Sequence, residues 1–291
     1  MTVEAPSRIS IERLFSAADE PAARTRGGAL PNSLRESYGG DLAIPLRTDR
    51  PTVISNFVST LDGVVSYSTP EAAGGGEISG FNDADHFVMG LLRAVSDAVL
   101  IGAGTLRAGH GEAWSHRFTH KESAAALSDY RAELGLAPEP TTVVVSRRGD
   151  IDLSHPGLSN PDVPVLIVTT ERGAEWLRAR EHGPNLQILA AGTDEVAPLD
   201  VLAVLANHGA QLVLCEGGPH LFGQMLRAHL IDELFLTIAP QVAGRASDNP
   251  RLALVEGTAF TVAEAPWSRL VDLRRSDNHL FTRYRFEEIQ S

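Results

Sequence analysis

The stretch Leu212–Leu221 constrains the fold of this chain more than any other part of the sequence. A short aliphatic run ends at Glu216 and a Gly-Gly pair, and apolar residues at helical spacing follow directly. Such a junction brings the backbone close to a ligand, and the helix N-terminus presents unpaired N–H groups to an anion. The stretch therefore predicts either a phosphate-binding turn or an ordinary strand–helix connection whose glycines serve only the backbone. An ionised Glu216 only accepts hydrogen bonds, so we expect it to face a substrate or a ribose hydroxyl rather than a phosphate.

Strand and helix patterns alternate along the chain from Pro51 onward. The predicted strands are 52–58, 97–101, 141–145, 163–169, 186–189, 212–215, 233–238, 270–275 and 280–286. The predicted helices are 83–94, capped by Asn82, then 124–134, 171–180, 199–207 and a segment that begins after Gly218. This alternation predicts an α/β fold with a mostly parallel sheet flanked by helices. The last two strands have no helix between them, which predicts an antiparallel C-terminal edge.

Residues 1–50 are predicted to form an N-terminal extension to a domain of residues 51–291. The extension holds one short amphipathic pattern, Ile11, Leu14 and Phe15, which predicts a helix. A loop rich in Arg, Gly, Pro and Ser is expected to follow it.

The composition argues against several classes of protein. A formal net charge of −12 is unfavourable for binding nucleic acid or an anionic membrane surface, which needs clustered Lys and Arg. No apolar run reaches the ~20 residues of a membrane span, and acidic residues interrupt the N-terminus where a signal peptide would be apolar. We therefore expect a cytoplasmic protein with a small-molecule partner. The single cysteine, Cys215, cannot form an internal disulfide, and its apolar strand predicts a buried core residue rather than a nucleophile.

Polar residues gather where the predicted parallel strands end, and open α/β sheets bind ligands at that edge. Gly102–Thr105 follows one strand and Gly217–Gly218 another. Two glycine-containing turns at separate helix starts suit the two phosphates of a dinucleotide. Arg147 and Arg148 follow a third strand, where guanidinium groups would bind a ribose 2′-phosphate and favour NADPH over NADH. A solvated charged turn explains this arginine pair equally well.

For several other polar residues the sequence allows a purely structural role as well as a functional one. Arg93 follows an apolar helical stripe. Its side chain either contacts a substrate or extends to the surface, and this pattern alone favours the surface. Asp62–Gly63 after the first strand is, taken alone, a turn. The histidines considered as metal ligands are His86, His110, His116 and His120. Their spacing matches no common zinc motif, so no metal site is predicted.

Taken together, these segments resemble the reductase domain of riboflavin biosynthesis, a member of the dihydrofolate reductase-like superfamily. The resemblance covers Pro51 to about Phe286. Its landmarks, in chain order, are 55–63 (SNFVSTLDG), 78–80 (ISG), 91–94 (LLRA), 101–105 (IGAGT), 216–219 (EGGP), 230–234 (LIDEL), 238–240 (IAP) and Gly244. The resemblance implies a dihydrofolate reductase-like fold over residues 51–291.

The function that the resemblance implies is NADPH-dependent reduction of a pyrimidine that carries a ribosylamino phosphate, with hydride added to the ribose C1′. Glu216 and Asp62 are the candidate catalytic residues, and Asn56, Arg93 and Glu216 are the candidate substrate contacts. The expected NADPH contacts are Ser59, Ile78, Gly102, Thr105, Ser146, Arg147, Gly217, Gly218, Pro219, His220 and Leu221. Members of this family typically form homodimers joined near the sheet edge, so the resemblance implies a homodimer here.

Three features distinguish this chain from the bifunctional members of the family. The paired H-x-E and P-C-x-x-C zinc motifs of the deaminase half are absent, so we expect a stand-alone reductase. Asn56 stands where bacterial bifunctional enzymes carry Lys, and archaeal and fungal-type reductases have Asn, which favours a diamino-pyrimidinone substrate. The Asp-Asp-Pro after the Gly-x-Gly-Thr turn is replaced by 107–112 (RAGHGE), so the substrate phosphate would need another base, such as His116 or Arg117.

Two other functions remain open on the sequence. One is the reduction of dihydrofolate, another pteridine or an unassigned small molecule. The other is nucleotide binding by a module that kept the fold without catalysis.

Overall fold

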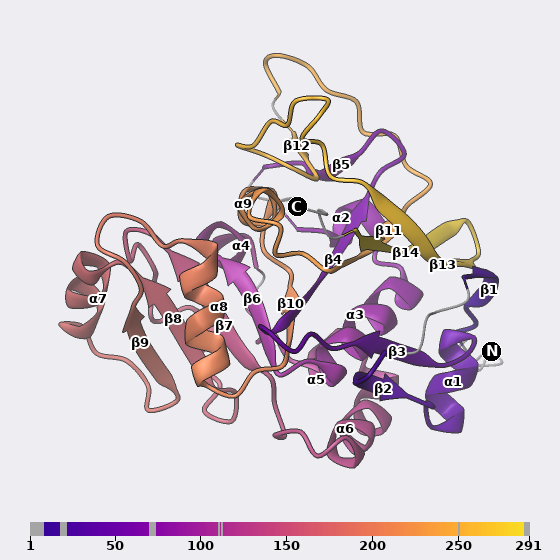
Figure 1. Ribbon diagram of the computed structural model, residues 1–291, viewed down its shortest axis with the longest axis horizontal. Coiled ribbons are helices and arrows are strands. Elements are labelled where there is room, and N and C mark those ends of the chain that lie inside the picture. Colours follow the sequence, from indigo (N-terminus) through magenta and orange to yellow (C-terminus); the bar gives the residue numbers. More distant parts are fainter. Residues whose placement is uncertain are drawn as a thin grey trace, which may run out of the picture.

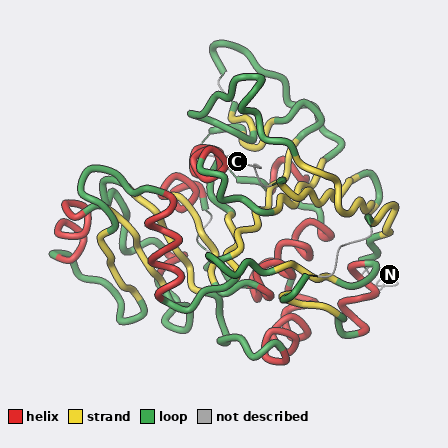
Figure 2. The backbone as a smooth tube through the Cα atoms, in the orientation of Figure 1, coloured by secondary structure: helices red, strands yellow, loops and turns green. Residues whose placement is uncertain are grey.

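The computed structural model describes residues 9–17, 22–69, 74–109, 111, 113–249 and 251–287 (Figures 1 and 2). The start of the predicted extension lies outside these ranges, as do His110 and Glu112 of the loop after Thr105. Helices lie on both sides of the strands in Figure 2, and the described chain alternates between the two kinds of element.

The centre of the structure is a ten-stranded sheet in the order β1-β13-β14-β11-β4-β10-β6-β7-β8-β9. Its strands are β1 (Glu12–Ser16), β4 (Thr52–Ser59), β6 (Ala98–Gly102), β7 (Thr141–Ser146), β8 (Val165–Thr169), β9 (Leu186–Ala190), β10 (Leu212–Cys215), β11 (Glu233–Ile238), β13 (Ser268–Ser276) and β14 (His279–Phe286). Neighbours from β11 to β9 pair in parallel. The pairs β11–β14, β14–β13 and β13–β1 are antiparallel. The predicted α/β class, mostly parallel sheet and antiparallel C-terminal edge are confirmed.

Helices cover both faces of this sheet. They are α1 (Asn32–Tyr38), α2 (Gly76–Ser79), α3 (Asp83–Val95), α4 (Ala103–Ala108), α5 (His116–Thr119), α6 (Ala124–Glu133), α7 (Glu171–Arg178), α8 (Pro198–Asn207) and α9 (Pro219–Arg227), with 3₁₀ turns at Lys121–Ser123 and Pro156–Leu158. Helices α3 and α6 pack into one buried cluster, and α8 and α9 pack into another (Figure 1). The side chain of Asn82 accepts a hydrogen bond from the backbone N–H of Asp85, which confirms the predicted cap of α3.

The alternation of side chains along a parallel strand explains why both faces need cover. On β6, Val99 packs into the cluster that contains Phe87 of α3, whereas its neighbour Leu100 packs into the cluster that contains Met225 of α9. Cys215 lies in this second cluster and is fully buried. Burial raises the pKa of its thiol to about 12, so the predicted core role is confirmed.

The N-terminal segment differs from its prediction. The residues predicted as a short helix form strand β1, which pairs antiparallel with β13. Ile11 is buried, whereas Leu14 and Phe15 are both exposed, so the three side chains share no buried face of the kind an amphipathic helix needs. The predicted loop contains α1 between two paired strands, β2 (Thr25–Gly28) and β3 (Leu42–Pro45).

Side chains from this segment enter the main core. Leu34 and Tyr38 of α1, with Leu42 and Ile44 of β3, are buried in the same cluster as α3 and α6. The described part of residues 1–50 therefore packs on the sheet and its helices, and the boundary at residue 50 stays a prediction.

Another two-stranded sheet lies near the end of β4 and was not predicted. It consists of β5 (Val64–Ser66) and β12 (Leu252–Ala253), which pair antiparallel (Figure 1). These strands are too short to produce a recognisable alternation in the sequence. Within the described ranges, no helix has the length and apolar character needed to cross a membrane.

Candidate active site

A cavity of about 1560 Å³ lies at the carboxyl ends of β4, β6 and β10. These strands are neighbours in the order β4-β10-β6, so the last of them in the chain is inserted between the other two. In open α/β sheets a crevice forms at such a point, because the connections on either side leave in different directions. Val65 and Ser66 of β5, with Leu252 of β12, add the small sheet to the cavity wall.

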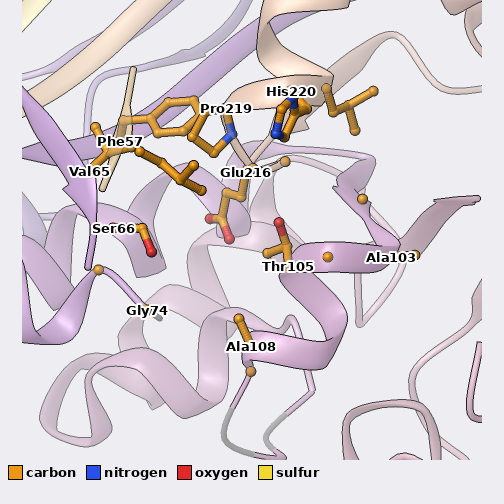
Figure 3. Close-up of a pocket in the computed structure, with 18 of the residues that line it drawn as sticks. Phe57, Val65, Ser66, Gly74, Ala103, Thr105, Ala108, Glu216, Pro219 and His220 are labelled. Atoms are coloured by element: carbon orange, nitrogen blue, oxygen red, sulfur yellow. The ribbon is translucent and has the colours of Figure 1, made fainter. Parts of the chain in front are cut away.

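Most of the residues predicted for the site line this cavity. They come from β4, from α3, from the turn after β7, and from the strand–helix junctions β6–α4 and β10–α9. The lining residues among them are Asn56, Arg93, Gly102, Thr105, Arg147, Glu216, Gly217, Gly218, Pro219, His220 and Leu221. Figure 3 shows the carboxylate of Glu216 pointing into the space between Ser66 and Thr105.

Three predicted cofactor contacts lie behind the cavity wall rather than on it. Ser59 and Ser146 are buried at the ends of β4 and β7. Ile78 of α2 is buried among Val58, Val64 and other apolar side chains. None of the three belongs to the described lining of the cavity, and their contact with a cofactor stays a prediction.

Asp62, predicted to be catalytic, also lies outside the described lining of the cavity. Its carboxylate accepts hydrogen bonds from Thr60 Oγ1 at 2.6 Å and from the backbone N–H groups of Ala243 at 3.1 Å and Gly244 at 2.7 Å. The bond from Thr60 is the largest of the effects that lower the pKa of Asp62 to about 2. These contacts join the β4–β5 turn to the loop after β11, and the catalytic role of Asp62 stays a prediction.

Arg93 and Glu216 form a buried ion pair in the cavity. Arg93 Nη2 donates to Glu216 Oε2 at 2.6 Å, and Arg93 Nε donates to Oε1 at 3.0 Å. Each side chain is 9% exposed. The backbone N–H of Glu216 donates to the carbonyl of Leu100 at 3.0 Å, so strand β6 fixes the residue that follows β10. The surface position that the helical pattern alone favoured for Arg93 is wrong, because Glu216 provides a partner for its charge inside the protein.

A second buried arginine holds the end of the helix that carries Arg93. Arg131 of α6 is 1% exposed, and its Nη1 donates to the backbone carbonyls of Arg93, Ala94 and Ser96. These carbonyls lie at the helix C-terminus, where backbone acceptors lack the regular partners of the helix interior. Burial lowers the pKa of Arg131 to about 10, so the guanidinium remains charged at neutral pH. The position of Arg93 is thus fixed from its backbone as well as from its side chain.

The two glycine-containing turns come close together at the cavity. An added Cβ at Gly218 would lie 3.2 Å from Thr105 Oγ1, and one at Gly217 would lie 2.7 Å from Leu221 Cδ2. Glycine at position 218 therefore allows the start of α9 to approach α4, and glycine at position 217 leaves room for Leu221 of α9. No side chain caps either helix start, so N–H groups of the first turns remain available to a ligand. This arrangement fits the phosphates of a dinucleotide.

The two consecutive arginines after β7 have different positions. Both are exposed, but Arg147 lines the cavity and Arg148 is absent from its described lining. Of these two arginines, Arg147 is the one placed to contact a ligand in the cavity.

The two bases suggested for the substrate phosphate are also absent from that lining. His116 is fully buried, with Nε2 at 2.9 Å from Ser128 Oγ, and burial lowers its pKa to about 4. Arg117 pairs with Glu139 at 2.8 Å. Neither residue is placed to bind a phosphate in this cavity. Among the described residues, no group of three or more His, Cys, Asp or Glu side chains is arranged to hold a metal ion.

Several lining residues were missed from the sequence. They include Val65, Ser66, Gly74–Glu77, Asp85, His86, Met89, Arg107, Trp114, Glu195–Pro198, Arg227, Leu252, Gly257 and Thr258. The signal for part of this set was present, because Asp85, Met89 and Arg93 follow one another at four-residue spacing on one face of α3. The others lie in loops and short strands, which carry no periodic signal.

Comparison with known proteins identifies the family. The model of the RibD C-terminal domain matches residues 51–278. A 2,5-diamino-6-ribosylamino-4(3H)-pyrimidinone 5′-phosphate reductase of Archaeoglobus fulgidus is 28% identical over 211 residues, which cover 72% of this chain and 89% of that protein. A protein of the same name from Methanothermobacter thermautotrophicus is 31% identical over 195 residues, which cover 67% of this chain and 80% of that protein.

Solved structures share the fold. A pyrimidine reductase-like protein of Corynebacterium diphtheriae superposes with a TM-score of 0.60 at 22% identity, covering 82% of this chain and 92% of that chain. A deaminase/reductase of Thermotoga maritima gives a TM-score of 0.61 at 22% identity, and the match spans 57% of that chain. The family match over residues 51–278 is the stronger result, since it covers most of the sequence. This chain belongs to the RibD C-terminal domain family.

Proposed function

We propose that this protein is an NADPH-dependent reductase of 2,5-diamino-6-ribosylamino-4(3H)-pyrimidinone 5′-phosphate and adds hydride to the ribose C1′. The observation that carries the proposal is the Arg93–Glu216 ion pair, which lies in the same cavity as two uncapped helix starts. The names of the two archaeal relatives support the choice of substrate. Asn56 lines the cavity, and the family resemblance associates asparagine at this position with the diamino-pyrimidinone rather than the deaminated ring.

The residues present fit a dinucleotide cofactor. Gly102–Thr105 and Gly217–Leu221 would hold the phosphates through backbone N–H groups, and Arg147 would bind the 2′-phosphate that distinguishes NADPH from NADH. NADPH supplies the hydride when bound. The protein then has to orient the two reactants and exclude water, which is the main requirement for hydride transfer.

Glu216 is the residue best placed to assist the substrate. Its carboxylate faces the cavity and would accept hydrogen bonds from ribose hydroxyls (Figure 3). It would also stabilise the positive charge that develops at C1′ when the ribose ring opens to an imine. Arg93 holds the carboxylate in one orientation through the hydrogen bonds that its guanidinium donates.

The test is NADPH oxidation with the ribosylamino-pyrimidinone phosphate and with dihydrofolate in parallel reactions. We expect turnover of the first substrate only. Turnover of dihydrofolate alone would replace the proposal with a pteridine reductase. Tight NADPH binding without turnover of either substrate would support a non-catalytic nucleotide-binding module.

A homodimer and a cytoplasmic location are further parts of the proposal, and both rest on the family resemblance. Light scattering coupled to size-exclusion chromatography measures the first, and fractionation of the source cells measures the second. A monomer at micromolar concentration would contradict the assembly without affecting the proposed reaction.

A further inference from the structure

One carboxyl group in the cavity differs from every other buried acid of the described chain. Asp85 lies in the first turns of α3, is 4% exposed and lines the cavity. The other buried acids, Glu139, Glu233 and Asp272, each pair with an arginine at 2.5–2.8 Å. No described Lys or Arg pairs with Asp85.

The neighbours of Asp85 come from four elements and are mostly neutral. The hydroxyls of Ser79 on α2 and Thr237 on β11 lie near its carboxyl group, and His86 on α3 and His279 on β14 are the titratable groups that face it. Burying an ionised carboxylate without a cationic partner is costly, so the neutral acid is favoured. The pKa of Asp85 is raised for this reason, with burial the largest cause. A neutral carboxyl group has one donor and at least one acceptor to offer a ligand.

Asp85 and Arg93 line the cavity from opposite ends of α3. Asp85, Met89 and Arg93 lie on one face of α3, and all three line the cavity. With a rise of about 1.5 Å per residue, Asp85 is about 12 Å along the helix from Arg93. The arginine side chain leans back toward the helix N-terminus, which shortens the distance between the two polar groups. A substrate whose ribose contacts Glu216 would reach Asp85 with its ring by extending along α3.

The strand register places Asn56 near the same end. Thr237 of β11 lies opposite Val58 of β4, and Asn56 is two residues before Val58, so it shares that face of the sheet. Asn56 lines the cavity as well. Two polar side chains, one from β4 and one from α3, thus approach the cavity where the heterocyclic ring would lie.

We propose that Asp85 contacts the substrate and hydrogen-bonds as a neutral acid to the amide edge of the pyrimidinone, donating to the 4-oxo group and accepting from N3–H. This inference rests on the proposed function and adds the group that recognises the ring. An ionised Asp85 would have a different preference, because two acceptors match N3–H together with the 2-amino group. The neutral acid binds the edge that the diamino-pyrimidinone shares with the corresponding uracil, so Asp85 recognises the ring without distinguishing the two.

The experiment compares wild type, Asp85→Asn, Asp85→Ala and the control Asp83→Asn, which removes an exposed charge from the same helix turn. An asparagine retains one donor and one acceptor, so Asp85→Asn should keep kcat/KM within about threefold of wild type, whereas Asp85→Ala should lose about 10- to 100-fold. NADPH affinity and the ratio of kcat/KM for the diamino-pyrimidinone and uracil substrates should be unchanged in all variants.

Three results would overturn the inference while leaving wild-type turnover, and with it the proposed function, intact. They are full activity of Asp85→Ala, a loss in Asp85→Asn as large as that in Asp85→Ala, and a loss confined to the 2-amino substrate. If Asp85→Ala does not fold, a substrate analogue methylated at N3 provides the test on the wild-type enzyme. We expect the analogue to bind at least about tenfold more weakly than the substrate, and equal affinity would overturn the inference.

Discussion

The guanidinium of Arg93 and the carboxylate of Glu216 meet at 2.6 Å although 123 residues separate them in the chain. Arg93 lies on helix α3, and Glu216 directly follows strand β10. The two residues come into contact because β10 is inserted beside β6 in the sheet. The pair is 9% exposed on each side, so it is stable only if both charges are present. This dependence makes it the first target for mutation.

We expect Glu216→Gln to lower kcat for the pyrimidinone substrate by about 100-fold or more, since an electrostatic contact to the reacting centre is lost. Leaving Arg93 without its partner should also reduce the free energy of unfolding by about 3 kcal/mol. Steady-state kinetics, NADPH titration and thermal unfolding measure the three effects. NADPH affinity should stay close to wild type. Loss of cofactor binding with normal substrate kinetics would show that Glu216 serves the cofactor.

A double variant separates stability from catalysis at this pair. Glu216→Gln combined with Arg93→Met removes both charges, so part of the lost stability should return. The reductase activity should not return with it. Recovery of activity would mean that neither charge acts on the substrate.

Arg147→Ala should weaken NADPH binding far more than NADH binding. A charge-assisted contact to phosphate contributes roughly 1.5–3 kcal/mol, which corresponds to about 10- to 150-fold in the dissociation constant. Arg148→Ala is the matched control, because Arg148 is exposed but absent from the cavity lining. Fluorescence titration with both cofactors gives the comparison. Equal effects of the two variants, or equal loss of both cofactors, would rule out selective binding of the 2′-phosphate by Arg147.

Asp62→Ala tests whether this residue is catalytic or joins two loops. Removing its bonds to Thr60, Ala243 and Gly244 should loosen the β4–β5 turn and raise the KM for substrate, with kcat lowered less than about tenfold. Because the pKa of Asp62 is about 2, the pH profile of kcat above pH 4 should keep its shape. A loss in kcat of about 100-fold or more with normal KM would instead support the catalytic role that the resemblance implies.

His116 should make folding stability depend on pH between about 4 and 6.5. Its folded pKa is lowered to about 4 from 6.5, so the unfolded chain binds more protons in this window. Stability is fully present above pH 6.5 and decreases as the pH falls toward 4, by about 3 kcal/mol in total. Denaturant unfolding of His116→Gln should show a shallower decrease than wild type. The exposed His182→Gln should behave like wild type, and a parallel decrease in all three proteins would contradict the assignment.

The sequence predicted the central fold well because its signals there are local. The aliphatic runs of β6, β8 and β10 and the apolar face of α3 are determined by burial on both sides of the sheet. Strand β1 was mistaken for a helix, since its apolar residues follow helical spacing and its real partner, β13, lies at the other end of the chain. Long-range pairing of this kind leaves no local pattern.

The same distinction applies to the site. Glu216 and the glycines around it were predicted, because a strand–glycine–helix junction is visible in one stretch of sequence. The burial of Arg93 was not, because it depends on a partner that only the fold supplies. The role of Asp85 was not predicted either. Its lack of an arginine partner among the described residues is visible only in the folded structure.

Strand β1 has a consequence for how the protein is made. Glu12 pairs with Arg275, so strand β1 finds its neighbour only after 263 further residues have been synthesised. A nascent chain on the ribosome would carry β1 without a partner until residues 268–286 emerge. Pairing between such distant segments is slow compared with local structure formation. Until it occurs, β13 offers an open edge to any other nascent strand, and domain swapping between two copies is the characteristic error that this order of synthesis permits.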